Sequence, residues 1–229
     1  NLNAQIPIHQ QTGATDFDSI IQADAFSVIH SRKFGELIIQ DSGGRMKPAN
    51  TFSSELLRKV SKSDTYKGLN SDQALLSIMN NPAIWYNVPL IYLKRGNDSV
   101  RKLAGIDLNA KYAPLLSFFD DLGTYKLAVP LEEAYRAATP NQFQKDFIEL
   151  DRRVNLLYSA LEGKVMRIFP IPNDENNKWV SYPELAEANF KGKDSLYVRN
   201  ILPLYFQSLR LAQKDQDYKQ ADNLLESIY

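Results

Sequence analysis

Basic side chains recur within one short segment, residues 34–62, where a turn and a helix are expected to hold them. Arg45 and Lys47 follow a Gly-Gly pair, and Arg58 and Lys59 lie further along the same segment. Guanidinium and ammonium groups bind carboxylates and other anions, and Arg can do so through two parallel N–H bonds. We interpret these four residues as candidates for partner binding. The alternative is that they only solvate a hairpin edge and one helix face.

The chain has two histidines, His9 and His30. Imidazole can ligate a metal or haem iron, but a neutral imidazole is also an ordinary hydrogen-bonding group. We expect the second role for His30 and keep it as a fifth candidate for partner contact. The methionines are isolated and are expected in the core. No acidic pair has the ligand spacing of a calcium loop, so we predict no metal site.

The sequence contains no self-contained catalytic set and therefore does not establish whether the chain is an enzyme. There is no GxSxG nucleophile elbow and no GxxxxGK[ST] phosphate loop. The absence of Cys excludes disulfides and thiol chemistry. The formal net charge is zero, and basic and aromatic residues are not interleaved, so we expect no nucleic-acid partner. No stretch approaches the roughly 20 apolar residues of a membrane span.

A β-hairpin followed by a helix is predicted to position the basic residues. Residues 37–40 form one strand, residues 41–44 (Asp-Ser-Gly-Gly) the turn, and residues 45–47 the return strand. Pro48 is expected to stop the ladder because it has no N–H. Asn50 or Thr51 would then cap a helix that carries Glu55 in its first turn.

The rest of the chain reads as mostly helical. Residues 16–34 fit helix or strand. The strongest helix is predicted for residues 139–161, capped by Thr139 before Pro140, with one apolar face made of Phe143, Phe147, Leu150, Val154, Leu157 and Leu161. Asn70 is predicted to cap a helix over 71–79. Further helices are predicted at 98–103, at 195–213 with a kink or break at Pro203, and at 218–228. Residues 88–93 and 165–169 are candidate strands that would extend the sheet of the hairpin.

These elements predict an α+β fold, predominantly helical, with a small, mainly antiparallel sheet and a C-terminal helical hairpin. Residues 1–15, rich in Asn, Gln and Thr, are expected to form an irregular N-terminal arm. Residues 16–229 would form the folded domain. If that domain has two lobes, the boundary is expected near 173–189.

Several blocks in order resemble one known family. They are FGELIIQDSGGRMKPANTFSSELLRKVSK from Phe34, GLNSDQALLSIMNNPAIWYNVPLIYL from Gly68, VNLLYSALEGKVMRIFPIPNDENNKWVS from Val154, and the closing residues 218–229. Together they resemble the periplasmic region of fused ResB/CcsA (System II) cytochrome c biogenesis proteins. None of the blocks is a catalytic signature.

The resemblance implies a soluble, periplasmic or extracytoplasmic domain of a cytoplasmic-membrane protein that exports haem and attaches it to apocytochrome c. The implied partners are the membrane-spanning remainder of the same polypeptide and apocytochrome c. Haem is expected for the parent protein and no cofactor for this fragment. The domain would help position apocytochrome c or support the membrane part. The alternative is a free-standing peptide-binding or scaffold domain, with a groove between the final helix pair and the helix predicted for residues 139–161.

Overall fold

The computed structural model describes residues 16–228, so the predicted arm at 1–15 lies outside the described residues. The segment that fitted helix or strand is helical, with α1 at Phe17–Ala23 and α2 at Val28–Gly35. Each helix starts at a side chain that accepts a backbone N–H, Asp16 from Ser19 and Ser27 from His30. These caps satisfy donors that a first helical turn leaves free.

The predicted hairpin is confirmed. Strand β1, Ile38–Gln40, pairs antiparallel with β2, Met46–Pro48, with Ile39 opposite Lys47. The Asp41 side chain accepts the N–H groups of Gly43 and Arg45 at 2.9 and 3.0 Å, and Gly44 has a φ of 80°. Pro48 is itself the last strand residue rather than the residue beyond the ladder.

Helix α3, Ala49–Ser61, begins earlier than predicted. Its N-cap is Pro48, and no side chain caps it, so the prediction of Asn50 or Thr51 as the cap is wrong. The reason is that Pro48 is extended, at φ −64° and ψ 147°, so that the strand passes directly into the helix without a loop. Glu55 consequently lies in the second turn. Arg58 and Lys59 lie in the last turn, where they complement the helix dipole.

The predicted helix after Asn70 is confirmed as α4, Ser71–Asn80, with a reciprocal capping box between Asn70 and Gln73. The ribbon β3–β4, Thr65–Tyr66 with Leu69–Asn70, precedes it, and the short α5, Pro82–Trp85, follows it. Trp85 is fully buried and donates its indole N–H to the Ser77 hydroxyl at 2.9 Å.

The middle of the chain contains one helix that the sequence did not predict. Helix α6, Asp98–Ala104, agrees with the prediction, whereas α7, Ala128–Arg136, was missed. The predicted strand at 88–93 shrinks to β5, Ile91–Tyr92, which pairs with β6, Tyr112–Ala113, and not with the hairpin. A 3-10 turn at Leu115–Phe118 follows β6.

Helix α8, Gln142–Leu161, is the strongly periodic helix that the sequence predicted. Asn141, not Thr139, is its N-cap, in a capping box with Gln144. Phe147 and Leu157 are fully buried, but Phe143 at the start of the predicted face is 45% exposed. The helix ends before Gly163, which has a φ of 71°.

The small sheet is a set of separate two-stranded ribbons rather than one sheet. Strands β7, Phe169–Pro170, and β8, Trp179–Val180, form the last ribbon, and a 3-10 turn at Tyr182–Ala186 follows. A single bridge between Gln40 and Arg167 joins this ribbon to β1. The predicted extension of the hairpin sheet by 88–93 is therefore wrong, and that by 165–169 is reduced to one bridge.

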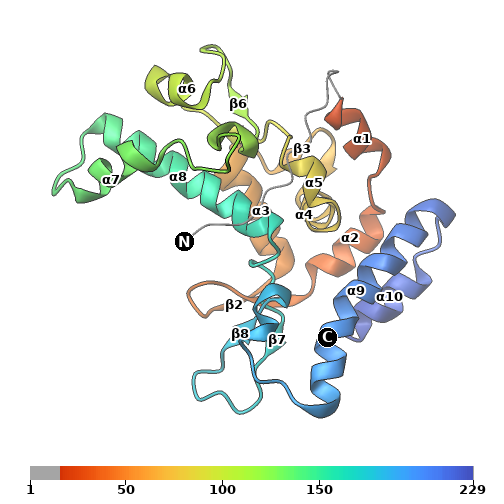
Figure 1. Ribbon diagram of the computed structural model, residues 1–229. Helices are drawn as coiled ribbons and strands as arrows, with labels where there is room; N and C mark the ends of the chain where they lie inside the picture. The colour runs from red at the N-terminus through yellow and green to blue at the C-terminus, as the bar shows by residue number, and fades with distance from the viewer. Residues whose placement is uncertain (1–15, 229) are drawn as a thin grey trace.

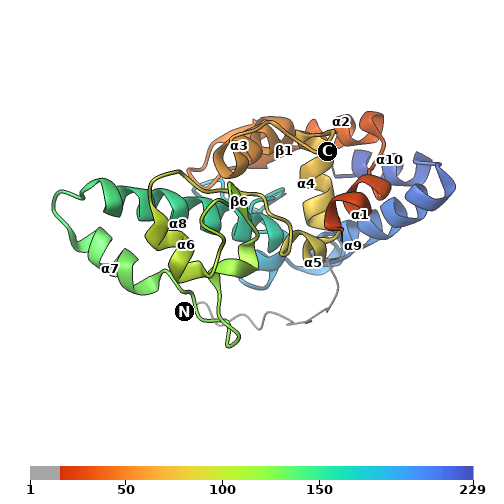
Figure 2. The same cartoon turned by 90° about the horizontal axis from the view of Figure 1, so that it is seen from above.

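The C-terminal helical hairpin is confirmed as α9, Gly192–Asp215, and α10, Lys219–Glu226. Pro203 lies inside α9, which continues through it. The C-terminal helical hairpin lies at one end of the molecule, and α7 and the start of α8 lie at the other. Helices α3 and α4 pack between the two ends (Figures 1 and 2). Buried apolar residues from Ile21 to Leu225 form one cluster. The lobe boundary near 173–189 stays a prediction.

None of the helices that the structure describes over residues 16–228 has both the length and the apolar composition of a membrane span.

Candidate functional site

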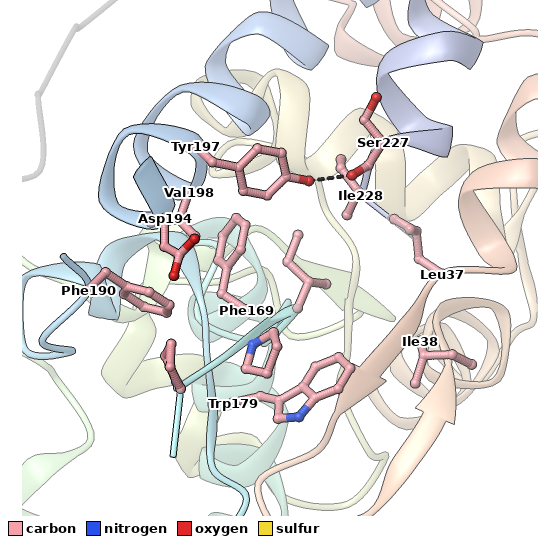
Figure 3. Close-up of a pocket in the computed structure, with 13 residues that line it drawn as sticks. Leu37, Ile38, Phe169, Trp179, Phe190, Asp194, Tyr197, Val198, Ser227 and Ile228 are labelled. Atoms are coloured by element: carbon pink, nitrogen blue, oxygen red, sulfur yellow. Dashed lines mark hydrogen bonds between the residues drawn. The ribbon is translucent and has the colours of Figure 1, made fainter. Parts of the chain in front are cut away.

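A groove of about 530 Å³ lies where the β1 strand, the β7–β8 ribbon and the two ends of the C-terminal hairpin meet (Figure 3). This volume lies in the range typical of ligand sites. Its lining is mainly apolar and aromatic and consists of Leu37, Ile38, Ile168, Phe169, Pro170, Pro172, Trp179, Phe190, Asp194, Tyr197, Val198, Ser227 and Ile228.

The Gln40 side chain fixes the strand wall of the groove. It is 6% exposed, accepts the Trp179 N–H at 2.7 Å, and donates to the carbonyls of Asn177 and Gly44 at 3.0 and 3.3 Å. One amide thus joins the hairpin turn to β8. Because a buried amide with these bonds cannot move without losing them, it holds Trp179 beside Ile38.

A hydrogen bond across the C-terminal helical hairpin fixes the helical wall of the groove. The Tyr197 hydroxyl in α9 donates to the Ser227 carbonyl after α10 (Figure 3). Burial raises the pKa of Tyr197, so the hydroxyl stays a donor at neutral pH. Tyr197 still exposes 43% of its surface and Ile38 exposes 42%. The groove therefore presents accessible apolar surface, and hydrogen bonds within each of its two walls hold the residues of that wall in place.

Asp194 is the one charged residue among the described residues that line the groove. It lies in the first turn of α9, and its carboxylate lies beside Phe190, across the groove from Leu37 and Ile38 (Figure 3). In the part of the chain that the structure describes, no cation lies within 4.0 Å of this carboxylate.

The predicted basic residues lie on the hairpin and α3 and do not line this groove. Lys47 is engaged internally, with its ammonium 3.2 Å from both Asp41 and Glu55. Burial alone would lower the pKa of Lys47, but the bonds to Glu55 and Asp41 outweigh it, so the pKa is raised. Lys47 thus ties the hairpin turn to α3.

Arg45, Arg58 and Lys59 are exposed. Lys59 lies 3.5 Å from Glu55, so Glu55 brings Lys47 and Lys59 together. Among residues 16–228, no carboxylate forms an ion pair with Arg45 or Arg58. The Arg45 guanidinium is accessible at the end of the hairpin, and its role toward a partner stays a prediction.

His30 is buried, with 1% of its surface exposed, and lies between α2 and the C-terminal hairpin. Its Nδ1 lies 2.7 Å from Asp222 and its Nε2 lies 2.9 Å from the Tyr205 hydroxyl. A carboxylate only accepts hydrogen bonds, so Nδ1 carries the proton and Nε2 accepts from Tyr205. Burial lowers the pKa of His30 more than Asp222 raises it. Partner contact through this ring would require α2 and α10 to separate.

The described lining of the groove includes no His, Lys or Cys side chain, and Asp194 is its one carboxylate. Over residues 16–228, no group of three or more His, Asp or Glu side chains gathers in a way that could hold a metal ion.

Sequence reasoning missed this groove. It placed the groove of the alternative hypothesis between the final helix pair and the helix predicted at 139–161, whereas the structure opens it between the helix pair and the β1 and β7–β8 strands. The sequence does contain several aromatic residues between Phe169 and Tyr197. Their common place in a groove could not be inferred from the sequence, because the opposite wall comes from β1, which only the fold brings beside them.

The chain is similar to Protein NrfI of Wolinella succinogenes. The two are 33% identical over 156 residues, which cover 67% of this chain and 17% of that protein. The matched region therefore spans about a sixth of the length of that relative. No protein-family profile matches the chain.

Proposed function

We propose that this chain is an extracytoplasmic domain of a membrane-bound cytochrome c biogenesis protein, in which it helps position apocytochrome c beside the membrane part. The observation that carries the proposal is the similarity to Protein NrfI, which supports a role in cytochrome c biogenesis. The match covers 17% of that protein, as a domain of a larger polypeptide would. The ordered ResB/CcsA resemblance supports the finer assignment.

The structure adds a surface suited to this task. A precursor chain that has not yet folded exposes apolar side chains that its folded state would bury. An apolar groove with ordered walls and accessible Ile38 and Tyr197 fits a segment of this kind. We propose that haem is bound by the parent protein and not by this domain.

Site-specific photocrosslinking in the full-length protein tests the proposal. A photoreactive residue in place of Ile38 in the groove should crosslink to apocytochrome c during maturation. The same residue in place of Leu122, which is 92% exposed and outside the groove, serves as the control. Maturation that proceeds normally without any crosslink from position 38 would contradict the positioning role.

The second candidate is a free-standing peptide-binding or scaffold protein, which the same groove favours. Reading the gene beyond the codon for Tyr229 separates the two. Membrane-spanning segments in the same reading frame support the first proposal, and a stop codon there with no span upstream supports the second.

A further inference from the structure

The groove combines two kinds of surface that favour one type of ligand. Three aromatic side chains, Phe169, Trp179 and Phe190, supply an apolar wall, and Asp194 supplies a single carboxylate at its rim (Figure 3). An apolar groove with one unpaired negative group complements an apolar segment that carries a positive charge.

We infer that the groove binds an extended peptide segment in which apolar or aromatic side chains lie next to a Lys or Arg, with the cation paired to Asp194. This inference rests on the proposed function and names the feature of the apocytochrome chain that the domain would recognise. The apolar side chains supply most of the affinity by burial, and the cation fixes the register of the segment.

The lining argues against haem as the occupant. Iron in haem is held by His, Cys, Met or Tyr, and Tyr197 is the one such residue among the described lining. The Tyr197 hydroxyl is already engaged by the Ser227 carbonyl. The two haem propionates would also be repelled by Asp194, because the groove lining as described holds no cation to offset them.

The charge effect should be small and measurable. Asp194 is exposed, so an ion pair there is screened by solvent. The positive end of the α9 dipole also weakens the attraction for a cation. We therefore expect the cation to change the affinity by about threefold to fivefold, the upper part of the range of about 1.4-fold to fivefold for an exposed pair.

The test is peptide binding to the whole chain, followed by fluorescence anisotropy. The probe is a labelled short peptide with Leu, Trp and Lys, compared with versions in which Gln replaces Lys or Ser replaces the apolar residues. The Lys-to-Gln change should weaken binding about threefold to fivefold in the wild type and leave Asp194→Asn unaffected. Asp98→Asn, an exposed first-turn aspartate of α6, is the matched control and should behave as wild type.

Trp179→Ala should weaken all apolar peptides at least tenfold, while a thermal melt reports whether the ribbon stays folded. Ile38→Ser, on an already exposed side chain, is the second variant for the same wall if Trp179→Ala unfolds the ribbon. Equal binding of the Lys and Gln peptides to wild type, or a saturable haem complex that displaces the peptide, would overturn the inference.

The outcomes for the groove and for the proposed function are separable. No peptide binding together with crosslinking of apocytochrome c from position 38 rejects the sequence preference and leaves the positioning role intact. Selective peptide binding together with normal maturation by Asp194→Asn and Trp179→Ala in the full-length protein supports the groove and rejects the positioning role.

Discussion

At the scale of single residues, the structure separates two groups of candidates that the sequence could not. Lys47 and His30 are engaged within the fold, whereas Arg45 and Arg58 are exposed without an ion pair among residues 16–228. For His30 the sequence already favoured a hydrogen-bonding role, whereas the residue types of Lys47, Arg45 and Arg58 fit either role. Burial and the identity of the nearest carboxylate decide between them, and both depend on contacts between segments distant in sequence.

The buried His30 should make stability depend on pH near neutrality. Its pKa is lowered in the folded state from an ordinary value of 6.5. Below that value the unfolded chain binds a proton that the folded chain resists, so stability is present above pH 6.5 and is lost as pH falls toward the folded pKa. The loss cannot exceed about 1.4 kcal/mol per pH unit for one proton.

Urea unfolding of wild type and His30→Gln between pH 7.5 and 5 measures this effect. The variant should be less stable throughout, because Asp222 and Tyr205 lose a bonding partner, and its stability should change less over this range. Hydrogen bonds from Lys33 and His30 lower the pKa of Asp222 against the effect of burial, so Asp222 titrates at more acidic pH. Equal pH slopes for the two proteins would assign the effect to another group.

Arg45 should matter for a partner and not for folding. Its guanidinium is exposed, so Arg45→Ala should change the free energy of unfolding by less than about 0.5 kcal/mol. In the full-length protein we expect the variant to mature less cytochrome c. Lys47→Ala is the contrasting variant and should be destabilised, because Asp41 and Glu55 lose their shared cation. A clear drop in the stability of Arg45→Ala, or unchanged maturation, would refute this assignment.

At the scale of elements, the sequence predicted what periodicity and turn chemistry determine. The Gly-Gly hairpin, the Asn70 cap and, apart from the exposed Phe143, the buried face of α8 were predicted correctly. It failed where a choice depends on distant contacts. The chain contains no local signal that tells β5 to pair with β6. The groove was lost for the same reason, since its walls come from segments more than a hundred residues apart. Helix α7 was missed although Pro130 lies in its first turn, where proline is tolerated, and helix-favouring residues follow it.

The start of α8 offers a matched pair of cap variants. Asn141 accepts the Gln144 N–H at 2.9 Å, whereas the exposed Thr139 lies before the helix. Asn141→Ala should lower the free energy of unfolding by about 1 kcal/mol, and Thr139→Ala should have little effect. Urea denaturation of both variants is the measurement. If Thr139→Ala lowered the free energy of unfolding more than Asn141→Ala, Thr139 would be the N-cap, as the Thr139-Pro140 pair of the sequence predicted.

At the scale of the molecule, one apolar cluster connects elements from both ends of the chain. Leu157 in α8 and Leu209 in α9 are each fully buried and belong to that cluster, although they lie on opposite sides of the predicted boundary at 173–189. A continuous core couples the two sides, because opening either one exposes apolar surface that belongs to the other. The groove lies between these sides, so its shape depends on the same coupling.

Cooperative unfolding follows from this core. Leu157→Ala and Leu209→Ala should each cost about 2 to 5 kcal/mol and should each lower the midpoint of one shared thermal transition. Differential scanning calorimetry measures both the midpoint and the number of transitions. Two lobes with separate cores would instead give two transitions, with Leu157→Ala moving one and Leu209→Ala the other. In that case the lobes would unfold independently, and the groove between the strands and the helical hairpin would open before the rest of the fold.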